Sequence, residues 1–225
     1  MKRTRVGRRE ELLRIYDLLN GHFGDLHWWP ADSPFEVMIG AILTQNTAWT
    51  NVEKAVIALK GQGLLTPEAL RRVAEATLAE TIRPSGCYRS KARKLKALIA
   101  FFFAEYGGRM DAMCREPLPT LREKLLAVWG IGAETADSIL LYACQKPVFV
   151  SDAYTRRILL RHGLITAEMS VDRIRELFMT QLPHDAALFN QYHALIVETG
   201  KTLCRKIPRC GACPLSSLLQ GGIPA

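Results

Sequence analysis

The stretch that decides the fold is "VWGIGAETADSIL", residues 128–140. A Gly-Ile-Gly turn separates two segments with helical spacing, about 118–127 and 134–144, which predicts two helices joined by a tight turn. Gly130 and Gly132 allow positive φ and a close approach of a ligand to the backbone. The second helix start, which includes Thr135, offers free N–H groups and a partial positive charge. We therefore predict a backbone phosphate site in this hairpin, with an ordinary αα-hairpin as the alternative.

The rest of the chain also has helical spacing, and only "KPVFVSD" (146–152) looks extended. The long helix in "YRSKARKLKALIAFFFAEYGG" should end at Gly107 and Gly108. Further helices are expected at about 153–162, 170–180 and 185–200. Residues typical of helix starts are Ser33, Pro34 and Glu36, then Thr50 and Glu53, then Thr66 and Pro67. The sequence predicts an all-α fold of many short helices.

The charge balance favours a polyanionic partner. Lys and Arg number 30 against 22 Asp and Glu, a formal net charge of +8. Basic residues gather in residues 1–10 and 89–96, which points to nucleic acid first. A merely basic soluble protein is the alternative, since a charged run is often a solvated face.

The lack of a long apolar segment bears on where the protein is located and on whether its cysteines are reduced. No run approaches the roughly 18 residues that span a bilayer, and no secretory signal is visible. We expect a cytoplasmic, nucleoid-associated protein with no membrane partner. Its six cysteines should then stay reduced or bind metal.

A carboxylate follows the hairpin at a suggestive distance. About twenty residues on, "VFVSDAYTRRIL" places Asp152 after apolar residues and before a basic helix. Asp152 should cap that helix. A capping carboxylate can still project into a cleft, so a chemical role is compatible with the structural one.

The hairpin, the aspartate and a Cys-rich C-terminus together resemble the endonuclease III family of DNA glycosylases, over essentially the whole chain. "LTQNT" (43–47) matches the family's Gln-containing segment that faces DNA. The resemblance implies a two-lobed helix-hairpin-helix fold. One six-helix lobe would span 29–148 and hold the hairpin at about 118–144. Residues 1–28 and 149–225 would form the second lobe with a Cys loop (204–213), and DNA would lie across the cleft between them.

The resemblance also implies roles for single residues. A flipped-out base would be excised, with Asp152 stabilising the cationic sugar and accepting a proton from water. Gln45 would fill or probe the gap in the base stack, unless it is an ordinary surface amide. Bifunctional members carry a Schiff-base lysine where this chain has Glu134. The resemblance therefore implies a monofunctional glycosylase without AP-lyase activity.

The base pocket is expected to include Trp28 and Trp29, for which core packing is the alternative. "WWP…LTQNT", "RPSG" (83–86) and "GIGAETADSILLYAC" resemble the 3-methyladenine glycosylase branch of the family. Tyr154 stands where lyase members often have His, and we assign it to the pocket. A cationic purine would stack well on an indole face.

The C-terminal cysteines suggest a metal group. Cys204, Cys210 and Cys213 form a C-x5-C-x2-C run, close to the family's C-x6-C-x2-C-x5-C iron–sulfur loop. The first gap is one residue shorter, and Leu219 stands at about the fourth cysteine's position. The resemblance implies a [4Fe–4S] cluster with an unknown fourth ligand; zinc or an empty loop are the alternatives. Three further cysteines are interpreted as structural: Cys87, Cys114 and Cys144.

The sequence thus predicts a monomeric base-excision-repair DNA glycosylase that acts on double-stranded DNA with a damaged base. The expected substrate is an alkylated purine such as 3-methyladenine. One alternative is a glycosylase for oxidised or mismatched pyrimidines. The other is a DNA-binding protein that keeps the hairpin without turnover, although an anion such as Asp152 beside DNA brings no advantage to a pure binder.

Overall fold

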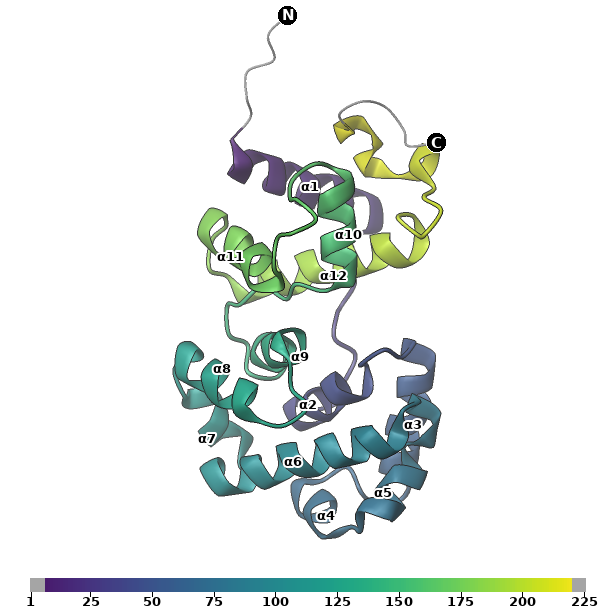
Figure 1. Cartoon of the computed structure of the whole chain (residues 1–225), viewed down its shortest axis with the longest axis vertical. Helices are drawn as coiled ribbons and strands as arrows, with labels where there is room; N and C mark the ends of the chain where they lie inside the picture. Colours follow the sequence, from purple (N-terminus) through teal and green to yellow (C-terminus); the bar gives the residue numbers. More distant parts are fainter. Residues whose placement is uncertain (1–6, 220–225) are drawn as a thin grey trace, which may run out of the picture. The chain divides into compact units, whose positions relative to one another are not determined.

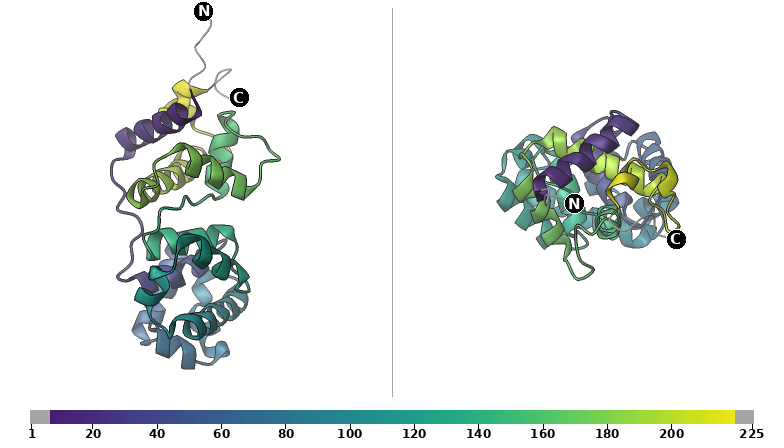
Figure 2. Two further views of the ribbon diagram at one scale, coloured as in Figure 1. Left: turned by 90° about the vertical axis from the view of Figure 1, so that its left-hand side faces the viewer. Right: turned by 90° about the horizontal axis from the view of Figure 1, so that it is seen from above.

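The computed structural model describes residues 7–219, and all regular structure in that range is helical (Figures 1 and 2). The predicted all-α fold is confirmed. The segment 147–152, which looked extended in the sequence, has no regular secondary structure. None of the helices in the described range is long and apolar enough to cross a membrane.

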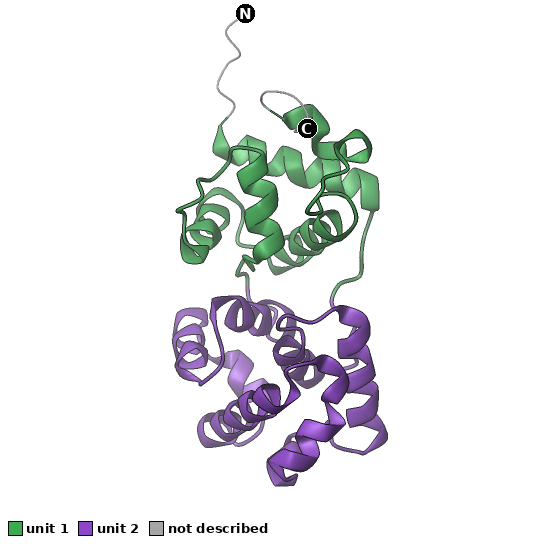
Figure 3. Cartoon of the chain, turned by 45° about the vertical axis from the view of Figure 1, so that its right-hand side comes forward, with its two compact units in different colours: residues 1–28, 147–225 green, residues 29–146 purple. Residues whose placement is uncertain are grey.

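The chain divides into two compact units (Figure 3). Unit 1 comprises residues 1–28 and 147–225, and unit 2 comprises residues 29–146. Unit 2 contains α2 (Pro34–Leu43), α3 (Trp49–Gly61), α4 (Pro67–Arg72), α5 (Glu75–Thr81), η1 (Arg83–Ser85), α6 (Tyr88–Tyr106), α7 (Met110–Arg115), α8 (Leu118–Ala127), α9 (Ala133–Ser138) and η2 (Ile139–Ala143). Unit 1 contains α1 (Arg8–Phe23), α10 (Ala153–Arg161), α11 (Val171–Gln181), α12 (Ala186–Thr202), η3 (Cys210–Ala212) and η4 (Pro214–Leu218).

Helix α2 lies in the centre of unit 2. The Ser33 hydroxyl accepts a hydrogen bond from Glu36 N at 3.2 Å, and Pro34 occupies the first turn, as predicted. Every residue from Phe35 to Leu43 is buried. A helix that is apolar all round must be covered on all sides, and α3, α6, α9 and η2 contact it. Its C-terminal end therefore holds the segment that follows it, 44–47, in a fixed place.

Two predicted helix boundaries in unit 2 are wrong. Helix α3 begins at Trp49 after Ala48, without a side-chain cap, so Thr50 lies inside the helix and is not its cap. The helix expected over 134–144 is α-helical only to Ser138 and then continues as a π-helical turn, Ile139–Ala143. The π turn is fully buried. Tertiary packing of this kind overrides local helix signals.

Unit 1 joins the first helix of the chain to its last third. Helices α1 and α10 both pack on α12. An aromatic cluster forms the core, with the rings of Phe149 and Phe178 stacked at 3.6 Å and Tyr192 edge-on to both. The Tyr192 hydroxyl donates to Leu12 O at 2.7 Å, which ties α12 to α1.

The expectation that the cysteines stay reduced or bind metal is wrong at two positions. Cys114 on α7 and Cys144 after η2 form a disulfide, with a Cα–Cα distance of 4.9 Å. They are 30 residues apart in sequence, and only the folding of α7 against the end of the hairpin brings them together. Within the described range Cys87, Cys204, Cys210 and Cys213 are free thiols.

Candidate functional site

Asp152 begins helix α10 and is held by three groups. One carboxylate oxygen, Oδ1, accepts from Thr155 N at 2.7 Å and from Thr155 Oγ1 at 2.8 Å, which confirms the predicted cap. The other, Oδ2, lies 3.6 Å from His193 Nε2 of α12. The Asp152 side chain is only 10% exposed and that of His193 only 8%. One oxygen is therefore used for capping, and the other faces a histidine.

These contacts keep the Asp152 carboxyl ionised. Burial alone raises the pKa of Asp152. The polar contact and the positive charge of His193, together with the two hydrogen bonds from Thr155, act in the opposite direction and outweigh burial, so the pKa of Asp152 lies below the usual value of 3.8. A buried carboxylate that is charged at neutral pH is suited to stabilise a cation next to it.

The rest of α10 is fastened to the end of α12. Arg157 donates to Cys204 O and to Gly200 O, both at 2.7 Å. The Tyr154 ring lies against Gly200, where an added Cβ would come within 2.3 Å of the ring, and the Arg157 guanidinium is 5.0 Å from its centre. Tyr154 is thus partly buried in unit 1 beside Asp152.

The glycine turn in unit 2 differs in part from the expectation. Gly130 has φ +85°, and a Cβ there would clash with the Lys94 side chain at 2.4 Å, so only glycine fits. Gly132 has an ordinary φ of −97°, which corrects the prediction of a positive φ at that position. Nothing lies within 4 Å of a Cβ added to Gly132. Its backbone is therefore open to a ligand at the start of α9.

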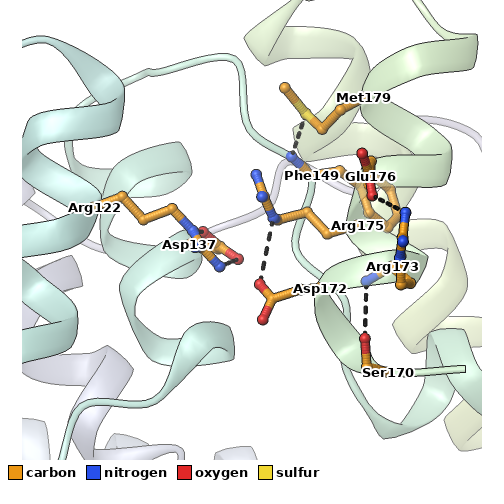
Figure 4. Close-up of polar contacts among 9 residues, drawn as sticks. All are labelled: Arg122, Asp137, Phe149, Ser170, Asp172, Arg173, Arg175, Glu176 and Met179. Atoms are coloured by element: carbon orange, nitrogen blue, oxygen red, sulfur yellow. Dashed lines mark hydrogen bonds and ion pairs between the residues drawn. The ribbon is translucent and has the colours of Figure 1, made fainter.

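A buried ion pair holds the two hairpin helices together. Arg122 of α8 donates from Nε to Asp137 of α9 at 2.7 Å and from Nη2 at 3.3 Å (Figure 4). The Asp137 side chain is 1% exposed and that of Arg122 is 15% exposed. Two parallel bonds of this kind fix both distance and orientation. Figure 4 also draws the ion pairs on α11, such as Arg173 with Glu176.

The Gln45 amide bonds to the hairpin. Its Nε2 donates to Gly130 O at 3.2 Å and to Thr135 Oγ1 at 3.0 Å, and its Oε1 accepts from Lys94 Nζ at 2.5 Å. Thr135 is itself buried. Gln45 is therefore not a loose surface amide. For it to enter a DNA stack, these three bonds would first have to break.

A buried lysine supports the segment that carries Gln45. Lys91 is 2% exposed, and its Nζ bonds to Leu43 O at 2.7 Å, Thr47 Oγ1 at 2.6 Å and Ser85 O at 2.7 Å. These acceptors lie on both sides of Gln45 and on the turn before α6. Burial lowers the pKa of Lys91 to about 8.

The two neighbouring tryptophans belong to different units. Trp29 contacts Trp49 edge-on, with ring centres 5.4 Å apart, and Tyr142 at 5.3 Å. Trp29 and Trp49 also line a cavity of about 350 Å³ with Gly40 and Glu53. Trp28 is half-buried in unit 1. Trp49, four residues after Gln45, was not predicted from the sequence to line this cavity.

The three C-terminal cysteines line one small cavity in unit 1. Arg161, near the end of α10, donates to Cys204 Sγ at 3.2 Å and to Arg205 O at 2.7 Å. Burial raises the pKa of the Cys213 thiol, and the nearby Cys204 and Cys210 raise it further. Within residues 7–219 no three His, Cys, Asp or Glu side chains converge to hold a single ion.

Glu134 lies in the first turn of α9 and is exposed. It stands two residues after Gly132, and its neighbours are Ala133 and Thr135. None of these three side chains carries an amine.

The chain belongs to the HhH-GPD superfamily of base excision DNA repair proteins, which it matches over residues 39–184. A Methanocaldococcus jannaschii protein named as a candidate DNA repair glycosylase is 45% identical over 208 residues, 92% of this chain and 94% of that protein. The fold is that of endonuclease III. A structure of a trapped endonuclease III–DNA covalent intermediate matches with TM-score 0.81 and 25% identity over 94% of this chain and 95% of that one.

A second solved structure is also similar. It is the 3-methyladenine DNA glycosylase of H. pylori bound to 1,N6-ethenoadenine, with TM-score 0.74 and 29% identity. The match covers 87% of this chain and 98% of that one. The chain is accordingly a DNA glycosylase of base excision repair.

Three residues around the site could not be identified from sequence. His193 sits among apolar residues of α12, where a histidine is more often a core residue than a partner of a carboxylate. Lys94 and Lys91 belong to a basic run that resembled a solvated face. Their contacts with Gln45 and Leu43 span 49 and 48 residues of sequence.

The open backbone at Gly132 leads to a prediction about DNA binding. Gly132→Asp adds bulk and negative charge where a phosphate would bond. We expect affinity for all duplexes to fall alike, by about tenfold or more, since hydrogen bonds to charged groups contribute roughly 1.5–3 kcal/mol. Gly61→Asp, also in open space, is the charge-matched control. Fluorescence anisotropy with several sequences measures both, and a loss confined to one sequence would contradict a phosphate-only role.

The His193 contact leads to a prediction about pH. In the wild type the Asp152 carboxylate becomes protonated, and so loses its charge, only as the pH falls through its lowered pKa, below 3.8. In His193→Gln burial acts with less opposition, so the Asp152 pKa rises and the acid limb of base excision moves to higher pH. Single-turnover excision against pH measures the limb, with exposed His184→Gln as control. An unmoved limb would show that His193 does not keep Asp152 ionised.

Proposed function

We propose that the protein is a monofunctional DNA glycosylase that hydrolyses the N-glycosidic bond of a damaged base in double-stranded DNA. The observation that carries the proposal is the buried, ionised Asp152, held by Thr155 and His193. Family membership supplies the class of reaction.

The reaction requires one carboxylate and one water. The bond from the sugar C1′ to the base nitrogen breaks, and its electron pair leaves with the base. The positive charge that develops on the sugar is stabilised by the Asp152 carboxylate. Water then adds to C1′, and its proton passes to Asp152 and on to solvent. The products are the free base and an abasic sugar in an intact strand.

None of the side chains of residues 133–135, at the start of α9, carries an amine, which supports water as the nucleophile. A Schiff base needs an amine at C1′, and Glu134 has only a carboxylate to offer. Strand cleavage coupled to base release is therefore not part of the proposed activity.

DNA binding is assigned to the hairpin. Gly132 and the first turn of α9 would donate N–H groups to a phosphate, and Lys94 supplies positive charge beside Gly130. Thr135 accepts from Gln45, so we assign it to fixing the hairpin beside the phosphate site. The net charge of +8 suits the same partner. We propose that the protein acts as a monomer.

The proposed substrate is an alkylated purine, 3-methyladenine first. Its cationic ring is a good leaving group and a good partner for an indole face. The H. pylori 3-methyladenine DNA glycosylase shares the fold of this chain, as endonuclease III also does, so the choice of substrate rests on the residues rather than on the fold. The aromatic-lined cavity beside Trp29 and Trp49 falls in the range of about 300–1,000 Å³ typical of ligand sites, and Trp28 is the other candidate to stack on the base. Tyr154, two residues after Asp152 and packed against Gly200, is retained as a proposed base-contacting residue of unit 1.

A [4Fe–4S] cluster is the proposed cofactor. Each protein ligand of such a cluster binds a different iron, so the ligands line a cavity and need not converge on one point. Cys204, Cys210 and Cys213 line such a cavity. Arg161 beside Cys204 Sγ offsets the negative charge of bound thiolates. The residues present therefore fit the group, which would stabilise the loop when bound.

The Asp152 assignment predicts a selective loss of chemistry. Asp152→Asn keeps a residue that caps helices well, so folding and DNA binding should persist. Excision should fall by at least about 100-fold, the effect of a lost acid–base group. Asp185→Asn, at the start of α12, is the matched control. Single-turnover base release measures both variants, and near-normal turnover in Asp152→Asn would remove Asp152 from the reaction.

The substrate assignment predicts the product of a lesion screen. Incubation with methylated DNA should release free 3-methyladenine, detected by chromatography, because the cationic base leaves without acid assistance. Duplexes with thymine glycol or a T·G mismatch form the opposing arm of the screen, and the likeness to endonuclease III makes that arm necessary. Efficient processing of those pyrimidines, with no free 3-methyladenine, would overturn the assignment.

A further inference from the structure

The cavity of the Cys loop has one more lining residue with a metal-binding side chain. His162, which directly follows the last residue of α10, lines the same cavity as Cys204, Cys210 and Cys213. Within residues 7–219 its Nδ1 is buried and has no hydrogen-bond partner. A buried nitrogen without a partner is uncommon in folded proteins, because water can no longer satisfy it. Imidazole is a regular ligand of iron.

The place of the missing cysteine is filled by a side chain that cannot bind metal. Leu219 stands six residues after Cys213, where the family's spacing has its fourth cysteine, and it lines the cavity. Three cysteines would bind three irons of a four-iron cluster. The fourth iron would need another donor from this cavity.

The position of His162 is fixed relative to the cysteines. Arg157 and Arg161, on the same helical turns as His162, bond to the backbone of residues 200–206 and to Cys204 Sγ. His162 is five positions after Arg157 and directly follows Arg161, so the end of α10 and the start of the loop form one connected piece.

We propose that His162 is the fourth protein ligand, giving a [4Fe–4S] cluster with three cysteines and one histidine. The proposal rests on the proposed cluster and goes beyond it by assigning its open position. It also explains how the chain can do without a cysteine at Leu219. Neutral imidazole in place of a thiolate makes the cluster less negative, as in the histidine-ligated iron–sulfur centres of higher potential.

The test uses the full chain with its cluster reconstituted under anaerobic conditions. Iron and sulfide are first measured for the wild type. Pulsed electron paramagnetic resonance of the reduced protein, labelled with ¹⁵N-histidine, then reports a nitrogen bonded directly to the cluster. We expect roughly four irons per chain and a strong ¹⁵N coupling. Zinc alone, or no metal, in the wild type overturns the cofactor and this proposal with it.

Variants separate the ligand from the loop. His162→Ala should lose the ¹⁵N coupling and yield a three-iron signal after oxidation. The double variant His162→Ala with Leu219→Cys should regain four irons, without nitrogen coupling and with a lower reduction potential than the wild type. Ser216→Ala, which changes another polar residue of the cavity, is the control and should keep the coupling. A wild-type cluster without ¹⁵N coupling, or an unchanged spectrum in His162→Ala, would overturn the His162 assignment while leaving the proposed cluster intact.

Discussion

The contact on which the site depends is the carboxylate of Asp152 at the start of α10. Its Oδ1 satisfies the backbone at Thr155, and its Oδ2 meets His193 on α12. Burial alone would favour the neutral acid, and these partners reverse that preference. The capping bond thus fixes one oxygen in space, while His193 keeps the group charged. Structural and chemical roles are combined in one residue, because the same carboxylate that caps the helix supplies the negative charge that the proposed reaction needs.

Helix α10 also connects the site to the Cys loop. Asp152 lies at one end, and at the other Arg157 and Arg161 bond to the end of α12 and to the residues just beyond it. The helix has only nine residues, so a change in the loop would be felt at Asp152 through a short, rigid element. The proposed metal group would therefore have a structural role, although its cysteines are far from Asp152 in sequence. It would fix the helix that carries the Asp152 carboxylate.

In unit 2 a second network fixes the hairpin. Gln45 joins Gly130 to Thr135, and Lys94 covers the turn while bonding to Gln45. The segment that faces DNA in the family and the hairpin are therefore one hydrogen-bonded unit here. Any insertion of Gln45 into a DNA stack would release the hairpin at the same time.

Local signals in the sequence predicted much of this, and distant contacts explain what they missed. The caps at Ser33, Thr66 and Asp152 follow from side chains that bond to backbone three residues away. The glycine turn was also predicted from a local signal, the conformational freedom of glycine, although only Gly130 needs its positive φ. The role of His193 and the Cys114–Cys144 disulfide depend on which helices meet. No spacing rule carries that information, because residues far apart in sequence become neighbours only through tertiary packing.

The proposed reaction depends on water as the nucleophile. The most direct measurement follows base release and strand cleavage in the same samples of an end-labelled lesion duplex, with borohydride added to a parallel set. We expect free base to accumulate while the strand stays intact until alkali is added, and we expect no covalent protein–DNA adduct. Strand cleavage that keeps pace with base release, together with a trapped adduct, would contradict that proposal.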